Sequence, residues 1–441
     1  MRTPAILALA VAAGALIPAF GTAPARASVT LATGDSRSVS QPSIPATCTT
    51  LTAQLATSNE QFSSADETTP PDSARIQSAL NSCGGTGKAV VLAPSGSDNA
   101  FLAGPLSLPA SVDLVIEAGV TGSNAGIMGT QNGSGSQGEI DGRGDQDILG
   151  TSGTWWALAN TANSDGKKQN NPRLIESDGN NNLTLYDIDL VNAPFFHVYF
   201  QSGNGLTVWG VRIKTPATAR NTDGVDPDSA TNVTVNDSFI EDGDDGIAIK
   251  TNSAAASNMT IENSHFYGTH GISIGSQTQY GVTNILVQND TVSGTDSSGN
   301  VSTDNNGIRI KTSSSEGGKV SDVSYVNICD TGVKHNLEFN PFYSSGNGST
   351  TPDFTDIVVD GFKSVSSASS AQSVLEGYDS ANPLGLTLEN VSLDATSSSA
   401  EYATISTDNT NFTPSGTDVT VTPISGSGSV PSCTFPSYPG L

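Results

Sequence analysis

The sequence predicts an all-β solenoid, a parallel β-helix, in which short strands stack in successive turns of the chain. First, one strand pattern recurs roughly every 23 to 38 residues, a spacing typical of repeat folds. Second, apolar residues alternate with polar ones in each instance, as in a strand with one buried face. Third, stretches with helical period are scarce. The instances of the recurring strand pattern are Asn182–Leu185, Gly205–Val208, Asn232–Val235, Asn258–Ile261, Asn284–Val287, Asp322–Tyr325, Asp356–Val359 and Gly385–Leu388.

A second strand follows in the same repeats, at Gly246–Ile249, Gly271–Ile274 and Gly307–Ile310. Several short strands in each repeat favour a parallel β-helix. A β-propeller is the competing repeat fold, but its blades run to roughly 40 residues. A β-sandwich does not need strict recurrence of one pattern.

One helix is expected before the first repeats. Asp72 is a candidate N-cap, Ile76, Ala79 and Leu80 share one face, and Cys83–Gly85 ends the segment. Because a solenoid needs its open end covered, we interpret this segment as an N-terminal capping helix.

Several asparagines begin Asn-x-Ser/Thr sequences, the acceptor pattern for glycosylation. They are Asn182, Asn232, Asn258 and Asn390. We favour a structural interpretation, because Asn suits the turns between solenoid strands and Thr suits the strands themselves.

The N-terminus has the pattern of an export signal. Arg2 gives a positive start, residues 6–20 are mostly apolar, and Ala25–Ala27 fits the small-x-small cleavage rule. The apolar run is too short for a membrane anchor. We therefore predict a signal peptide over residues 1–27, a new N-terminus at Ser28, a secreted, extracellular protein, and a single β-helix catalytic domain over residues 28–441.

The chain carries 18 basic and 43 acidic side chains, a net charge of −25. This balance argues against nucleic acid or an anionic membrane as partner, and we expect a monomer. A site for an anionic ligand must therefore gather cations locally.

Four cysteines, Cys48, Cys83, Cys329 and Cys433, fit an oxidising compartment, where they allow three pairings. Nearest neighbours favour Cys48–Cys83, which leaves Cys329–Cys433 to hold the C-terminus. The chain has no C-x-x-C or His-rich spacing typical of zinc sites, and we expect neither a metal nor a cofactor.

Alignment of the second strands brings polar residues into one column. Asp223–Val225, Asp245–Ile247, His270–Ile272 and Asn306–Ile308 share one register. Successive rungs of a β-helix lie about 4.8 Å apart, so residues at equivalent positions stack. Asp223, Asp245 and His270 thus become neighbours although they are far apart in sequence.

Two further groups adjoin this column. Arg309 and Lys311 stand at alternate positions of the next strand and share one face. Asp244 precedes Asp245, and strand alternation would place the two on opposite faces. We therefore expect a bend near Gly246 that brings both into one cleft.

This constellation fits glycoside hydrolysis, which needs one carboxyl to protonate the leaving oxygen and a second to activate water or attack. Clustered carboxylates raise at least one pKa by repulsion, and a guanidinium can bind a sugar carboxylate with two hydrogen bonds. Taken singly, each feature also has another explanation. The Asp pair is typical of a calcium site or a turn cap, His270 is typical of a turn, and Arg309 with Lys311 is typical of a solvated strand face. Their arrangement on adjacent rungs favours catalysis.

Four segments resemble the signature motifs of polygalacturonases, glycoside hydrolase family 28. In order, they are Asn221–Asp223, Asp244–Asp245, Gly268–Gly271 and Arg309–Lys311. The likeness to bacterial endo-polygalacturonases extends to Phe101–Pro109, Ile140–Gly144 and nearly all of the mature chain.

The resemblance implies a right-handed parallel β-helix and inverting, metal-free hydrolysis of α-1,4-galacturonosyl bonds in polygalacturonate or de-esterified pectin, an acidic polysaccharide. It implies that Asp244 is the general acid, that Asp223 and Asp245 are the bases that activate water, and that His270 supports the acid. The substrate-binding residues that it implies are Arg309, Lys311, Tyr343 and Asn221.

The chain departs from the family pattern at two positions. Thr269 replaces the usual Gly before His270, which removes freedom at positive φ and is expected to change the geometry of His270. Gly246 replaces a Cys of fungal and plant members, so that disulfide is absent. In addition, the long polar loop Gly294–Asn305 is expected to narrow the cleft.

Other functions also fit these residues. Within the same class they are an exo-polygalacturonase and a rhamnogalacturonan or xylogalacturonan hydrolase, although Arg309 and Lys311 indicate a carboxylate next to the cut. A pectate lyase also uses a β-helix, but the acid cluster with His270 fits hydrolysis better. A non-catalytic polysaccharide-binding solenoid is the third class, and the complete set of acidic residues argues against it.

Overall fold

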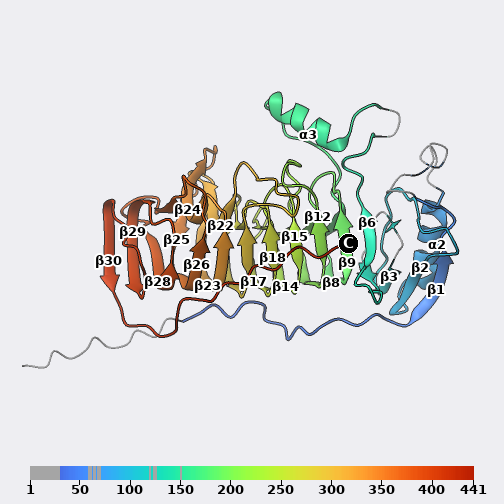
Figure 1. Ribbon diagram of the computed structural model, residues 1–441, viewed down its shortest axis with the longest axis horizontal. Helices are drawn as coiled ribbons and strands as arrows, with labels where there is room; N and C mark the ends of the chain where they lie inside the picture. Colours follow the sequence, from blue (N-terminus) through green and yellow to red (C-terminus); the bar gives the residue numbers. More distant parts are fainter. Residues whose placement is uncertain are drawn as a thin grey trace, which may run out of the picture.

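The computed structural model describes residues 30–57, 62, 66, 71–118, 121–122, 127–148 and 151–441. The predicted signal peptide and Ser28 lie outside these residues. Strands β1 to β30 join in one hydrogen-bonded sheet whose strand pairs are parallel. The sheet winds around a long axis, with its strands side by side in Figure 1. This arrangement confirms the predicted parallel β-helix.

The repeated pattern of the sequence forms one face of the coil, which we call the repeat ladder. Leu183, Leu206, Val233 and Met259 occupy equivalent positions on successive rungs, as the alignment predicted. Its central strands are β8 (Asn181–Tyr186), β11 (Asn204–Trp209), β14 (Thr231–Asn236), β17 (Ala256–Glu262), β20 (Val282–Gln288), β23 (Lys319–Thr331), β26 (Ile357–Val365) and β28 (Leu384–Ser392). Its outer strands are β1 (Thr47–Thr52), β2 (Lys88–Ala93), β3 (Val112–Ile116), β5 (Ile127–Gly129), β29 (Ser398–Asp408) and β30 (Thr417–Pro423).

A second face, which we call the site ladder, holds the second strand of each repeat. Ile247, Ile272 and Ile308 stack along it and are at most 2% exposed, so each contributes roughly 1.5–3 kcal/mol by burial. Its strands are β7 (Ile175–Asp178), β10 (Val198–Gln201), β13 (Val225–Asp228), β16 (Ile247–Ile249), β19 (Ile272–Ile274), β22 (Asn306–Ser313), β24 (His335–Ser344) and β27 (Ser373–Glu376).

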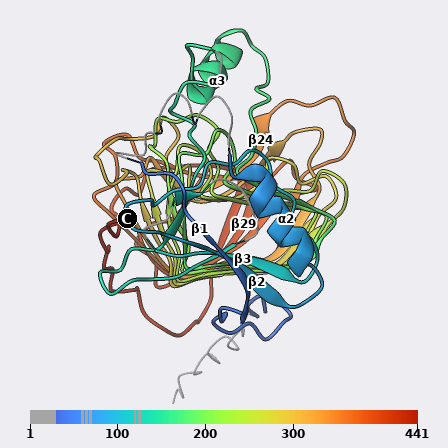
Figure 2. The ribbon, with the colours of Figure 1, turned by 90° about the vertical axis from the view of Figure 1, so that its right-hand side faces the viewer.

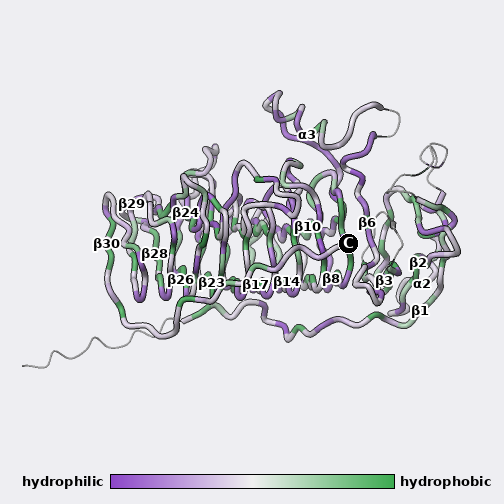
Figure 3. Tube along the Cα trace, viewed as in Figure 1, coloured by the Kyte–Doolittle hydropathy of each residue, from purple (hydrophilic) through white to green (hydrophobic). Residues whose placement is uncertain are grey.

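A third face closes the coil. Its strands are β4 (Thr121–Gly122), β6 (Gly138–Asp141), β9 (Ile188–Val191), β12 (Arg212–Lys214), β15 (Phe239–Glu241), β18 (His265–Tyr267) and β21 (Thr291–Ser293). The short β25 (Asp353–Phe354) pairs with β23. Figure 3 shows hydrophobic colour along the stacked strands and hydrophilic colour on the segments beside α3 (Trp155–Ser164).

Asparagine marks the bends that begin the repeat ladder. Asn182, Asn232, Asn258 and Asn284 have φ between 58° and 59°, the left-handed region that Asn tolerates better than most residues. The Asn284 Nδ2 also donates to the Asn258 Oδ1 at 2.9 Å. These angles support the turn interpretation of the Asn-x-Ser/Thr sequences.

Helix α2 (Ser73–Cys83) lies across one end of the coil, as Figure 2 shows, with Ile76 and Leu80 buried against the first rungs. This confirms the capping helix. The N-cap expectation for Asp72 is wrong in one respect, because its side chain makes no capping hydrogen bond. Its backbone is already helical, and the carboxylate turns away to accept from Leu102 N at 2.7 Å.

A second described helix, α3, was not predicted from the sequence. It begins where the Thr154 Oγ1 accepts from Ala157 N at 3.1 Å, and it stands above the coil in Figure 1. Only Ala159 of this helix is buried, whereas Leu158 is 47% exposed. A helix with so small an apolar face leaves little periodic signal.

The N-terminal segment, residues 30–46, runs lengthwise outside the coil (Figure 1). Its amides reach side chains far along the sequence: Ala32 N donates to the Ser324 Oγ at 2.8 Å and Gly34 N to the Asn284 Oδ1 at 3.0 Å. The Arg37 Nη2 donates to Leu206 O at 2.7 Å. The segment therefore crosses several rungs.

The C-terminal segment, residues 424–441, also lies along the coil. The Tyr438 hydroxyl donates to Ile213 O at 2.8 Å, and the Arg212 Nη1 donates to Gly440 O at 2.9 Å. Two disulfides form as the neighbour argument favoured, Cys48–Cys83 near the capping helix and Cys329–Cys433 at the C-terminal segment.

Candidate active site

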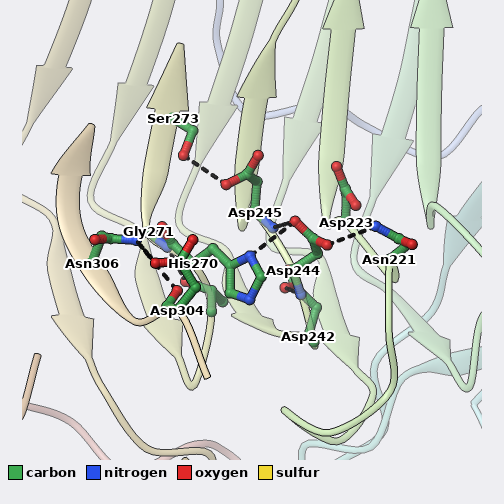
Figure 4. Close-up of polar contacts among 12 residues, drawn as sticks. Asn221, Asp223, Asp242, Asp244, Asp245, His270, Gly271, Ser273, Asp304 and Asn306 are labelled. Atoms are coloured by element: carbon green, nitrogen blue, oxygen red, sulfur yellow. Dashed lines mark hydrogen bonds and ion pairs between the residues drawn. The ribbon is translucent and has the colours of Figure 1, made fainter. Parts of the chain in front are cut away.

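The predicted column of polar residues is present at the start of the site-ladder strands. Val225 pairs with Ile247, Ile247 with Ile272 and Ile272 with Ile308, in the register expected from the sequence. Asp223, Asp244, Asp245 and His270 lie in the turns just before these strands, and Figure 4 shows them side by side.

Asp244 and Asp245 both line one cavity of about 540 Å³, together with Asp223, His270 and Lys311. The expected bend exists, but it begins before Asp245. The Asp244 Oδ1 accepts from Asp245 N at 3.0 Å, which closes a tight turn. At Gly243 a Cβ would meet Ala219 O at 2.0 Å, so only glycine allows the chain to pass this close to the neighbouring segment.

Asp244 sits between an imidazole and an amide. The His270 Nδ1 lies 3.0 Å from one oxygen, and the Asn221 Nδ2 donates to the other at 2.9 Å. Burial alone would raise the pKa of Asp244, but the charge and hydrogen bond of His270, aided by Lys311 and Lys250, bring it well below its usual value.

The His270 pKa moves the opposite way. Burial lowers it, but the charge and hydrogen bond of Asp244, with Asp245 and Asp304, raise it above its usual value. Because the two groups share a hydrogen bond, the protonation of each depends on that of the other.

The expected constraint from Thr269 is not observed. Positive φ falls on Gly268 at 66° and Gly271 at 95°, and Thr269 is not among the residues with positive φ. Its buried hydroxyl instead accepts from Gly271 N at 3.0 Å, which fixes the turn that carries His270. A threonine at this position therefore stabilises the loop rather than straining it.

Asp245 is held from the opposite side. The Lys311 Nζ lies 3.1 and 2.8 Å from its two oxygens, and the Ser273 hydroxyl donates to it at 2.7 Å. Asp245 is 3% exposed and Lys311 4%, so this is a buried ion pair with both carboxylate oxygens satisfied.

Arg309 does not line the cavity. It is 1% exposed, and its guanidinium lies 2.8 Å from Asp304, 3.0 Å from Glu338 and 3.6 Å from Asp245. The Tyr343 ring covers it, with 5.0 Å between the guanidinium carbon and the ring centroid. Arg309 thus lies behind the site, whereas Lys311 faces the cavity and lies 4.9 Å from the same ring.

Asp223 has a partner that sequence reasoning missed. The Lys250 Nζ lies 3.1 Å from Asp223 and forms a closer ion pair with Asp226. The Lys250 side chain is only 11% exposed. This makes a buried triad of two carboxylates and one ammonium.

Burial, the charge of Asp226, and the charges of Asp244 and Asp245 raise the pKa of Asp223 well above its usual value, against the opposing charge of Lys250. Burial raises the pKa of Asp226 to about 6, although Lys250 opposes it. The expectation that clustering raises a carboxyl pKa is therefore met at Asp223, whereas the pKa of Asp244 is lowered.

Strand alternation could have found the triad. In β13, Val225 points into the coil and the next residue, Asp226, points outward. Lys250 directly follows β16, pairs with Asp228 of β13, and also lies at an outward position. The alignment of residues that precede each strand does not include these outward positions. His197 is fully buried and bonds to Asp223 O at 3.1 Å.

The cavity has a wall on each side. The loop Gly294–Asn305 contributes Thr303 and Asp304, in accord with the expected narrowing. The opposite wall comes from α3 and the segment after it, including Lys167, Lys168 and Gln169. The Gln169 Nε2 donates to the Asn221 Oδ1 at 3.0 Å, so this wall is tied to the residue that binds Asp244.

Asp244, Asp245 and His270 are also the group among the described residues whose candidate metal-ligand atoms lie within 4.8 Å of one another. The ammonium of Lys311 already contacts both Asp245 oxygens, and His270 uses Nδ1 toward Asp244. A metal ion would have to displace these contacts. The donor set therefore fits proton chemistry better than metal binding.

A parallel β-helix whose cavity gathers Asp223, Asp244, Asp245 and His270 fits the acid/base chemistry of a glycoside hydrolase. Residues 117–413 match the model of Glycosyl hydrolases family 28, and the chain belongs to that family of glycoside hydrolases.

Relatives agree with this assignment. A polygalacturonase of Ralstonia solanacearum is 37% identical, over 88% of this chain and 85% of its own. An endo-polygalacturonase of Pectobacterium carotovorum subsp. carotovorum is 38% identical, over 82% and 90%. The solved polygalacturonase from Erwinia carotovora ssp. carotovora superposes with a TM-score of 0.70 at 37% identity, over 84% of this chain and 99% of that one. The resemblance seen in the sequence is confirmed.

Proposed function

We propose that this chain is an exported endo-polygalacturonase that hydrolyses α-1,4-galacturonosyl bonds of de-esterified pectin with inversion. The observation that carries the proposal is the meeting of Asp223, Asp244 and Asp245 with Lys311 in one cavity. The carboxylates suit acid/base hydrolysis. The lysine supplies a cation for a uronate carboxylate within a chain of net charge −25.

Asp244 is the general acid in this proposal. In the free protein the shared proton resides on His270, because the pKa of Asp244 is lowered and that of His270 is raised. A bound uronate excludes water, which favours the neutral pair over the ion pair and so favours transfer of the proton to Asp244 Oδ1 across the 3.0 Å hydrogen bond. Asp244 then protonates the leaving glycosidic oxygen.

Asp223 and Asp245 activate the attacking water. Each has a buried lysine beside it, Lys250 for Asp223 and Lys311 for Asp245. These ammonium groups favour the ionised carboxylates that a base requires.

Substrate recognition belongs to Lys311, Tyr343 and Asn221, which line the cavity. Arg309 lies beneath Tyr343 and neutralises the acids around it, so we assign it the task of holding Lys311 and the ring in place. Direct binding of a sugar carboxylate by Arg309 would require Tyr343 or Asp304 to move aside.

Export is supported by the N-terminal pattern of residues 1–27 and by two disulfides, which are typical of oxidising compartments. Neither of the helices described here has the length and apolarity to cross a bilayer. Endo action is supported by the name of the Pectobacterium relative.

Product analysis on de-esterified polygalacturonate tests the proposal. We expect a fast loss of viscosity relative to reducing-end release, mixed oligomers as early products, and the inverted anomer by NMR. Slow viscosity loss with monomer first would show exo action. An unsaturated product that absorbs in the ultraviolet and disappears with chelator would instead show a lyase.

A further inference from the structure

The wall formed by α3 and the segment after it carries cations that the proposed chemistry does not use. Lys167, Lys168 and Arg220 line the same cavity as the catalytic carboxylates. All three side chains are exposed, unlike Lys250 and Lys311 deeper in the cavity.

These wall cations are available to a ligand. Within the described residues, Lys168 and Arg220 make no ion pair. Lys167 pairs at 2.9 Å with Asp165, but their side chains are 72% and 50% exposed. Ion pairs this exposed contribute little, so a stronger anion can displace them.

The wall is also anchored, so its cations stand at a defined place. The Trp156 Nε1 donates to Ala193 O at 2.9 Å, and the Asn171 Nδ2 donates to Trp155 O at 2.8 Å. Gln169, next to Lys168, bonds to Asn221 at 3.0 Å. A ligand held by these lysines is therefore placed relative to Asp244, which Asn221 also contacts.

We propose that Lys167, Lys168 and Arg220 form a distal binding site for the carboxylates of a polyuronate, beyond the sugars that flank the scissile bond. This inference rests on the proposed function and names where the rest of the polymer lies. A strongly acidic protein repels a polyanion, so a run of cations leading into the cavity offsets that repulsion locally. Exposed cations at the rim of the cavity are suited to a polymer with repeated carboxylates, because each cation binds one carboxylate weakly.

Binding to the Asp244→Asn variant tests the proposal without turnover. The probes are de-esterified polygalacturonate and digalacturonate, and the wall variant adds Lys167→Gln with Lys168→Gln. Since an exposed ion pair is worth little, we expect Kd for the polymer to rise roughly three- to tenfold, with Kd for the dimer unchanged. The difference should shrink at high salt.

A matched control removes two exposed lysines outside the cavity, Lys88→Gln with Lys319→Gln, and changes the net charge equally. We expect the control to bind both probes as the Asp244→Asn background does. The proposal is overturned if the wall variant binds polymer normally, if the control weakens it equally, or if dimer binding falls by the same factor. A native protein that binds polyuronate through these lysines but does not cleave it would refute the proposed function alone.

Discussion

Lys250 and Lys311 stand on opposite sides of the candidate catalytic carboxylates and contact them differently. Lys250 bridges Asp223 and Asp226, so one ammonium serves two buried acids. Lys311 contacts both oxygens of Asp245, with the Arg309 guanidinium 3.6 Å from the same carboxylate. The Lys250 side of the site therefore has more acids than cations and raised carboxyl pKa values, whereas on the other side the Asp245 carboxylate has two cations beside it.

This difference shows that a buried lysine beside a carboxylate does not have a single effect. The effect of the lysine on a carboxyl pKa depends on how many acids share that lysine. Asp244 lies between the two sides and forms its ion pair with His270, while both lysines lower its pKa through their charge. Four substitutions test this division, in order of expected effect.

The largest effect is expected for Asp244→Asn, which removes the proton donor from the centre of the site. Turnover should fall by roughly 10²- to 10⁴-fold, the usual contribution of a general acid, while polygalacturonate still binds. The measurement is reducing-end release at saturating substrate. Asp242→Asn is the matched control, since Asp242 is buried nearby and its Asn could still accept from Asp244 N. Normal turnover by Asp244→Asn would remove Asp244 from the mechanism.

Lys311→Met tests the compensated side. It removes the cavity-facing cation and leaves Asp245 with one partner less, so kcat/KM should fall by roughly 100-fold, given the ~3 kcal/mol typical of breaking a buried pair. We expect much of the loss to be an increase in KM, since Lys311 is the proposed ligand of the uronate carboxylate. Lys311→Arg should recover part of it. A loss confined to kcat would argue against substrate contact.

Lys250→Met tests the acid-rich side and should leave KM nearly unchanged. Lys250 lowers the pKa of Asp223, so its removal raises that pKa further. Activity needs ionised Asp223, and the acid limb of the kcat/KM profile should therefore move to higher pH by about one unit or more. Lys250→Arg should restore the limb. An unmoved limb would exclude Asp223 as the base that controls it.

Asp226→Asn should give the smallest shift of the acid limb of the kcat/KM profile, in the direction opposite to that expected for Lys250→Met. Asp226 raises the pKa of Asp223 by repulsion, so its neutral replacement lets Asp223 ionise at lower pH, and the acid limb moves down. Thermal denaturation of both variants checks that the fold is kept. If Asp226→Asn and Lys250→Met shift the limb the same way, the triad does not act through Asp223.

The fold was largely predictable because its signal is periodic. Alternation within strands and recurrence between them set the register, and that register alone is enough to place Asp223, Asp245 and His270 together. Helix α3 was not predictable by the same means, since only Ala159 of it is buried.

Most residues of the candidate site could be predicted from the sequence, but their pairing could not. A sequence shows that Arg309 and Lys311 share a face, but not that Asp304 and Glu338 enclose the arginine from a loop and the next strand. Likewise, strand alternation places Lys250 on the same outward face as Asp226, but it does not give the 3.1 Å approach of Lys250 to Asp223. Charge compensation depends on three-dimensional distances that no repeat pattern encodes.

The lengthwise terminal segments bear on the order of folding. A solenoid of nearest-neighbour contacts can fold progressively from any rung. Here Ala32 bonds to Ser324 and Arg37 to Leu206, so the first residues dock only after most of the chain has formed. Contacts of such long sequence separation slow folding. We expect a late docking step, detectable as slow protection of the Gly34 amide in hydrogen exchange during refolding.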